Sequence, residues 1–152
     1  IQAIDLLGRK VLLDQGAKLR KFTKLIHKFC QQYEGHAQLG EFVNPLAKLM
    51  KEIGEITMGI GMASLSNKDE AGAAATDYLR LVGHLTYAWL WARMAEVAYA
   101  KLGQGEDAFY NAKIATARFY YAKLLPEAEA LKASIKTGAK PLMALEEAHF
   151  GF

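Results

Sequence analysis

A Glu-x-x-His spacing near the C-terminus is the feature of this sequence most typical of metal ligands. Glu146 and His149 stand three residues apart, as in the di-iron helical bundles. Such bundles need two of these motifs and two further glutamates facing inward. A second copy is absent, and His27, His36 and His84 stand far apart without ligand spacing. We therefore predict no metal site.

Other residues with chemical potential are explained more simply by packing. Cys30 lies on the apolar side of a helical pattern, where cysteine is usually an inert hydrophobe, and no nucleophile–base pair is recognisable. Gly59-Ile60-Gly61 lacks the preceding strand and the third glycine of a phosphate loop. His84 suits a hydrogen-bonded core histidine. The clusters 89–91 and 119–121 could line a ligand pocket, although core or interface packing is the simpler account. We predict no catalytic residue.

The elements that position these residues are all helical. Apolar residues recur at helical spacing almost throughout, and alternation typical of strands is nowhere sustained. The 152 residues suit a single domain with its own core. We predict an all-α, up-and-down bundle of about four long helices, with a short N-terminal helix and an apolar C-terminal tail docked on the bundle. The long helices are expected at about 17–33, from 45 to about 63, from about 68 to 102, and from about 106 to 137.

Proline, asparagine and glycine mark the expected helix ends. Asn44-Pro45 is typical of an N-cap followed by proline at the first helical position. A loop is expected at about 64–68, followed by a capping box formed by Asn67 and Glu70. Pro126 should kink or break the last long helix. Glycines inside the second long helix, Gly54 among them, are expected where a neighbouring backbone approaches closely.

The helix expected at about 68–102 is apolar on almost every side. At 1.5 Å per residue it would span roughly 50 Å. A helix that is apolar all round is normally buried all round, whereas each helix of a small bundle should show one face to water. It should therefore lie at the centre of the bundle or pack against protein outside this chain.

Charge and cysteine content exclude some functional classes. A net charge of +3 is too small to favour nucleic-acid binding. The basic residues at positions 10–28 could bind phosphates or an acidic partner, but the solvated face of one amphipathic helix is the simpler account. One cysteine suits a reducing compartment, and no membrane span or signal peptide is recognisable, so we expect a cytoplasmic location. The first residue is Ile rather than Met, so we expect a piece of a longer protein.

Several stretches together resemble one protein family. The opening Ile1–Lys10 resembles the segment of bacterial acyl-CoA dehydrogenases that follows their active-site Glu-Gly-Thr-x-Gly. The remaining stretches resemble the extra C-terminal helical domain of one subfamily, which includes the 3-methylmercaptopropionyl-CoA dehydrogenases. The matching stretches are Ala71–Leu81, Trp91–Ala95, Phe109–Phe119 and Pro141–Leu145.

This resemblance implies a part of an FAD-dependent enzyme that oxidises an acyl-CoA thioester between its α and β carbons. Residues 1–16 would be the end of the catalytic domain, and 17–152 the C-terminal extension. The catalytic glutamate would precede Ile1, so this chain alone is expected to be inactive and to bind no FAD. Only Ile1 and Gln2 would touch the edge of the cofactor motif.

The resemblance also implies partners. They would be the upstream catalytic domains, the acyl-CoA substrate, an electron acceptor and further copies in a homo-oligomer. Interface candidates are Trp89, Trp91 and Arg93. The alternative is a free-standing helical interaction module without enzymatic activity.

Overall fold

The computed structural model describes residues 1–151, and this part of the chain is all-α without strands. The predicted fold class is confirmed. A short α-helix, α1 (Gln2–Ile4), continues as the π-helix η1 (Asp5–Leu12), and η3 (Glu147–Phe150) is a 3₁₀ turn in the tail. Between them lie α2 (Ala17–Gln32), α3 (Gly40–Ser66), α4 (Asp69–Lys101), α5 (Asp107–Phe119), the π-helix η2 (Tyr120–Leu124) and α6 (Glu127–Lys136).

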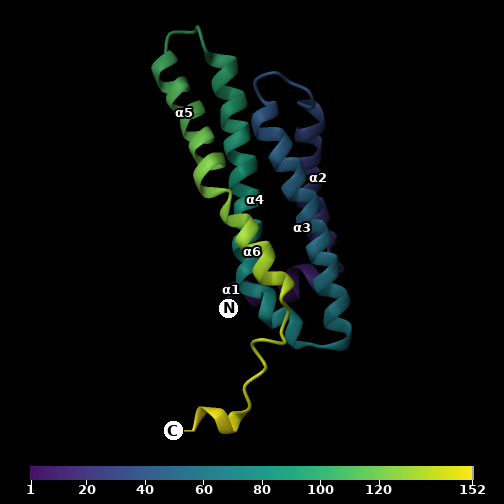
Figure 1. The fold of residues 1–152 in the computed structure, drawn as a ribbon. Coiled ribbons are helices and arrows are strands. Elements are labelled where there is room, and N and C mark those ends of the chain that lie inside the picture. The colour runs from purple at the N-terminus through teal and green to yellow at the C-terminus, as the bar shows by residue number, and fades with distance from the viewer. Residues whose placement is uncertain (152) are drawn as a thin grey trace.

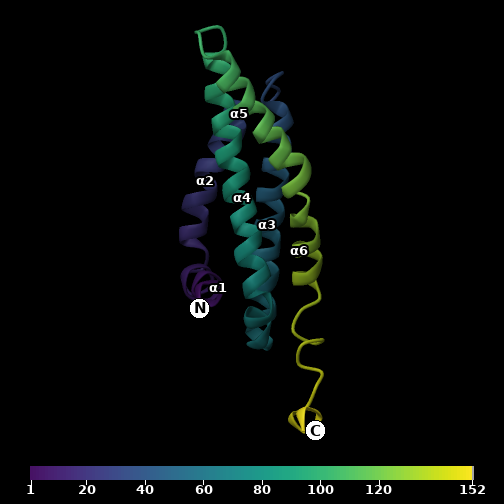
Figure 2. The same cartoon turned by 90° about the vertical axis from the view of Figure 1, so that its left-hand side faces the viewer.

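The long helices form an up-and-down bundle around α4. Helices α3 and α4 run antiparallel along the length of the molecule, with α2 on one side and the α5–η2–α6 segment on the other (Figures 1 and 2). α4 contacts α1, η1, α3, α5 and α6, so the helix that is apolar all round does lie at the centre. Its fully buried side chains include Tyr78, Leu81 and Leu85.

Residue chemistry explains most helix ends. Gly103 and Gly105 both adopt positive φ between α4 and α5, a conformation that costs glycine little. The C-terminal stop of α6 at Gly138 (φ +70°) is also as predicted. Pro126 is the N-cap of α6 and, as predicted, interrupts the last long helix. The helix departs from α geometry before the proline, at η2, where a π-turn absorbs the break.

The prediction for the start of α3 was wrong. The helix begins at Gly40, and Pro45 lies inside it, so Asn44 is not the N-cap. Phe42 and Val43, ahead of the proline, are buried in the core. Their burial outweighs the backbone hydrogen bond that proline cannot donate.

The turn before α4 also differs from the prediction. α3 continues to Ser66, so the expected loop shrinks to Asn67 and Lys68. The capping box does not form: the Asn67 side chain accepts a hydrogen bond from the Asp69 backbone at 3.1 Å. The Glu70 carboxylate instead accepts one from the backbone N–H of Ala139 at 3.0 Å. This competing partner lies 69 residues further along the chain, so local spacing could not reveal it.

Two further expectations were wrong. At Gly54 an added Cβ would meet no atom within 4 Å, so no neighbouring backbone approaches there, and the residue lines an open groove instead. The C-terminal tail does not dock: residues 140–151 are all exposed and extend away from the bundle (Figure 1). The end of α6 directs the chain past the end of the bundle, where no helix surface lies beside it.

Candidate functional site

The strongest polar cluster lies where α4 meets η2 and α6. The His84 Nε2 atom lies 3.0 Å from Glu127 Oε2, and its Nδ1 lies 2.9 Å from the Tyr120 hydroxyl. Arg80 pairs with the same glutamate. An ionised carboxylate only accepts hydrogen bonds, so Nε2 carries a hydrogen and donates a hydrogen bond to Glu127. In the neutral ring, Nδ1 then accepts a hydrogen bond from the Tyr120 hydroxyl. The expected hydrogen bonding of His84 is confirmed, but its side chain is partly exposed (13%) rather than fully in the core.

Burial sets the protonation of two members of this cluster. Burial, and then the charge of Arg80, lower the pKa of His84, so the ring favours its neutral form. Burial raises the pKa of Tyr120 to about 12. A phenol that stays protonated at neutral pH donates a hydrogen bond and is a poor nucleophile. The Tyr–His–Glu geometry therefore holds α6 and η2 against α4.

A second cluster ties α6 to α3. Lys132 is the one buried charged side chain among residues 1–151. Its ammonium donates to Glu129 at 2.8 Å and also to Glu52. Burial opposes the charged form, but these hydrogen bonds outweigh it and raise the pKa of Lys132. Further along the bundle, Arg118 makes a bidentate pair with Glu41, which connects α5 to α3. Both clusters are internally satisfied and leave no reactive group unpaired.

Sequence reasoning missed these clusters because their members come from distant parts of the chain. His84 and Tyr120 are 36 residues apart, and Lys132 and Glu52 are 80 apart. One signal was usable. Lys132 follows Glu129 by three residues on α6, a spacing at which opposite charges on a helix can pair.

The interface candidates lie on two sides of α4. Trp89 is half-buried: its ring meets the Phe22 ring edge-to-face at 5.8 Å, and the exposed Arg93 guanidinium lies 5.3 Å from its centroid. The indole nitrogen of Trp89 has no hydrogen-bond partner within residues 1–151. Trp91 is half-buried and packs against the core. The contacts of these residues with other protein remain predictions.

The outer side of α4 carries large apolar side chains that the bundle leaves uncovered. Tyr87, Leu90, Met94 and Val97 are all exposed, as is Phe109 at the start of α5. Four of these five line a groove of about 540 Å³ between the two helices. The all-round apolar pattern of this helix was the signal for such a surface. The sequence could not identify which side would be uncovered.

The remaining candidates stand apart from these clusters. Ile1 and Gln2 are exposed at the start of the chain, and their contact with a cofactor remains a prediction. In the tail, the backbone N–H of Glu146 donates to His149 Nδ1 at 3.0 Å, so the Glu-x-x-His motif forms a cap. Burial raises the pKa of the Cys30 thiol to about 11, which opposes thiolate formation.

The described part of the chain offers neither a metal-binding cluster nor a membrane-spanning helix. Residues 1–151 contain no group of three or more histidine, cysteine or acidic residues arranged to hold a metal ion. Within the same residues, no helix combines the length and apolar character needed to cross a bilayer.

Comparison with known proteins identifies two similar dehydrogenases. The chain is 30% identical over 160 aligned residues to the broad-specificity linear acyl-CoA dehydrogenase FadE5 of Mycobacterium tuberculosis, covering 99% of this chain and 26% of that protein. It is 34% identical over 137 residues to the 3-methylmercaptopropionyl-CoA dehydrogenase of Ruegeria pomeroyi, covering 86% of this chain and 22% of that protein. The chain thus spans about a quarter of the length of these relatives.

The family comparison agrees with this similarity and with the helical architecture. A family model described as acetyl-CoA dehydrogenase C-terminal like matches residues 22–146, which takes in α3, α4, α5 and α6 completely. The resemblance seen in the sequence motifs is confirmed. The chain belongs to the C-terminal-like family of the acyl-CoA dehydrogenases.

Proposed function

We propose that this chain is the C-terminal helical part of a cytoplasmic, FAD-dependent acyl-CoA dehydrogenase. The reaction would be α,β-dehydrogenation of an acyl-CoA thioester, with hydride transfer to the flavin. The single observation that carries this proposal is the family match over residues 22–146. The names of both relatives, an acyl-CoA dehydrogenase and a 3-methylmercaptopropionyl-CoA dehydrogenase, support it.

Within such an enzyme the bundle would act by packing rather than by contributing reacting groups. Its three polar clusters are used to hold helices together: His84 with Glu127, Lys132 with Glu52 and Glu129, and Arg118 with Glu41. Trp89, Trp91 and Arg93 are our candidates for contact with the rest of the enzyme. The catalytic glutamate, the flavin and most acyl-CoA contacts would belong to upstream domains, and the enzyme would be a homo-oligomer.

The test measures flavin binding and turnover by the purified chain. We expect the chain mixed with FAD and then desalted to retain no flavin absorbance, and to reduce no artificial electron acceptor with acyl-CoA substrates. The coding sequence upstream of Ile1 should read Glu-Gly-Thr-x-Gly in frame. A yellow, flavin-loaded preparation would contradict the packing role. An upstream frame without that motif would favour the free-standing interaction module.

A further inference from the structure

The groove between α4 and α5 is an apolar surface with a basic edge. We call it the α4–α5 groove; its apolar walls are Leu90, Met94, Val97 and Phe109. All four side chains are exposed. Uncovered apolar surface of this kind is typical of a site that another protein surface covers.

The charged residues that line this groove are both basic. The Arg93 guanidinium lies over the Trp89 ring, and the Lys113 ammonium lies 5.0 Å from the centroid of the Phe109 ring. Neither forms an ion pair within residues 1–151. Two unpaired cations beside an apolar wall favour a ligand that is both apolar and acidic.

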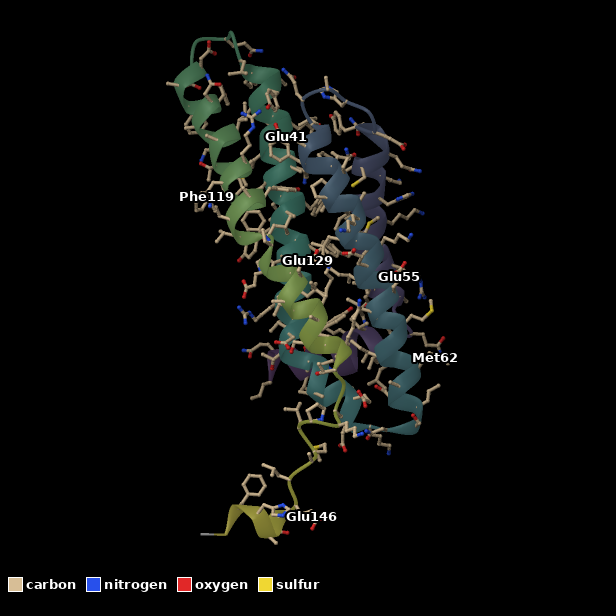
Figure 3. All side chains as sticks on the ribbon, in the orientation of Figure 1. Glu41, Glu55, Met62, Phe119, Glu129 and Glu146 are labelled. Carbon is tan, nitrogen blue, oxygen red and sulfur yellow. The ribbon has the colours of Figure 1, made fainter. Side chains whose placement is uncertain are left out.

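The C-terminal tail of this chain has that composition. Leu142, Met143 and Leu145 are exposed, and the acidic residues Glu146 and Glu147 follow directly. Hydrogen bonds between Glu146 and His149 organise this end of the tail as a short 3₁₀ turn. Figure 3 shows Glu146 well away from the bundle, on the extended tail. The tail therefore presents apolar and acidic groups with no partner surface beneath them.

The apolar residues Leu142, Met143 and Leu145 of the tail cannot fill the whole groove of their own chain. The tail leaves the bundle at Gly138, which lies beside Glu70 at the start of α4. Leu90 is twenty residues further along α4, or about 30 Å. Leu145 is seven residues beyond Gly138 and can reach at most about 25 Å even when fully extended. The tail and the α4–α5 turn also lie at opposite ends of the bundle (Figure 1).

We propose that the tail of a second copy of this chain docks in the α4–α5 groove, and that the exchange is reciprocal. In an antiparallel pair of bundles, the tail end of each copy lies beside the α4–α5 turn of the other. Both tails can then dock at once, which gives a closed two-fold dimer. Met143 and Leu145 fill the apolar part of the groove, and Glu146 and Glu147 pair with Arg93 and Lys113.

The first experiment measures self-association of the full 152-residue chain by sedimentation velocity, without flavin or acyl-CoA. We expect a dimer that weakens at least about tenfold in dissociation constant on Met94→Glu in the groove or Leu145→Glu in the tail, because each change places a charge against apolar surface. Met58→Glu, at an exposed methionine of α3, is the matched control and should leave the dimer intact. Circular dichroism verifies that each variant is folded.

A mixing experiment separates tail exchange from any other contact. Met94→Glu retains an intact tail, and Leu145→Glu retains an intact groove, so an equimolar mixture should form heterodimers through one restored contact. Lys113→Glu should weaken the dimer, and adding Glu146→Lys and Glu147→Lys should restore it. These surface changes keep the test valid if Met94→Glu fails to fold.

A monomeric wild-type chain, a mixture without heterodimers, or a dimer that only Met58→Glu disrupts would overturn the proposal. None of these outcomes involves flavin or turnover, so the dehydrogenase assignment would stand or fall separately.

Discussion

The two sides of α4 distribute large and small side chains in opposite ways. From Ala88 to the end of the helix, every buried residue is an alanine: Ala88, Ala92, Ala95 and Ala98. On the outer side of the same stretch stand the larger Leu90, Met94 and Val97. In a free-standing soluble bundle, a helix normally turns its large apolar residues toward the core.

The difference indicates two separate uses of apolar residues. Alanines on the inner side leave space for neighbouring helices to approach α4 closely, so that side chains of the surrounding helices fill the core. Large residues on the outer side keep more than a third of their surface exposed and so contribute less to folding than fully buried side chains of the same size. We infer that the inner side determines the stability of the bundle, whereas the outer side is available for association.

The largest expected effect is overpacking of the inner side. Ala92 is fully buried, and Ala92→Leu adds side-chain atoms where no space is left. We expect the free energy of unfolding to fall by about 1–3 kcal/mol, measured by urea denaturation. Leu90→Ala, two residues away on the outer side, is the matched control and should lower it by less, because Leu90 is 39% exposed and alanine has the higher helix propensity. Equal effects of the two changes would refute the comparison.

The sequence predicted most helix ends and offered a central α4 as one of two alternatives, but it did not distinguish the two sides of this helix. An all-round apolar pattern contains no periodicity that separates an inner from an outer face. Which side is covered depends on where α3, α5 and α6 pack, and those are contacts between distant segments. The alanines were recognisable as sites of close packing only once the neighbouring helices were in place.

Errors in the predicted elements share one physical cause. At Pro45, local propensity indicated a helix start, yet burial of Phe42 and Val43 extends the helix ahead of it. At Glu70, local spacing indicated a capping box, yet the carboxylate accepts from Ala139. In both places a tertiary contact outweighed a local preference of about 1 kcal/mol. The polar clusters escaped prediction for the same reason, since their partners are non-local.

An intermediate effect is expected at His84, which lies at the boundary between the two sides. Burial and Arg80 lower the pKa of the folded-state ring below the ordinary 6.5. The unfolded chain therefore takes up this proton first as the pH falls. Stability from the neutral ring is fully present above pH 6.5 and is lost as the pH drops from there through the folded-state pKa.

Urea denaturation across this pH range provides the test. The loss of unfolding free energy across this pH range should be smaller than the loss caused by Ala92→Leu. His84→Gln should make the free energy of unfolding depend less on pH. His27→Gln, at an exposed histidine of α2, should leave the slope as in the wild type. If stability rises as the pH falls and His84→Gln abolishes the rise, the ion pair with Glu127 dominates instead and His84 is protonated in the fold.

The smallest effect on folding is expected on the outer side itself. Val97 is 55% exposed, so Val97→Gln removes little buried surface, and glutamine has the higher helix propensity. The free energy of unfolding should stay unchanged or rise by a few tenths of a kcal/mol, measured in solution dilute enough for the chain to be monomeric. Binding of an apolar fluorescent dye to the folded chain should nevertheless decrease, because the dye reports uncovered apolar surface. A destabilisation comparable to that of Ala92→Leu would mean that Val97 packs within the chain. Unchanged folding with weaker dye binding would establish that Val97 belongs to an uncovered apolar surface that does not contribute to stability.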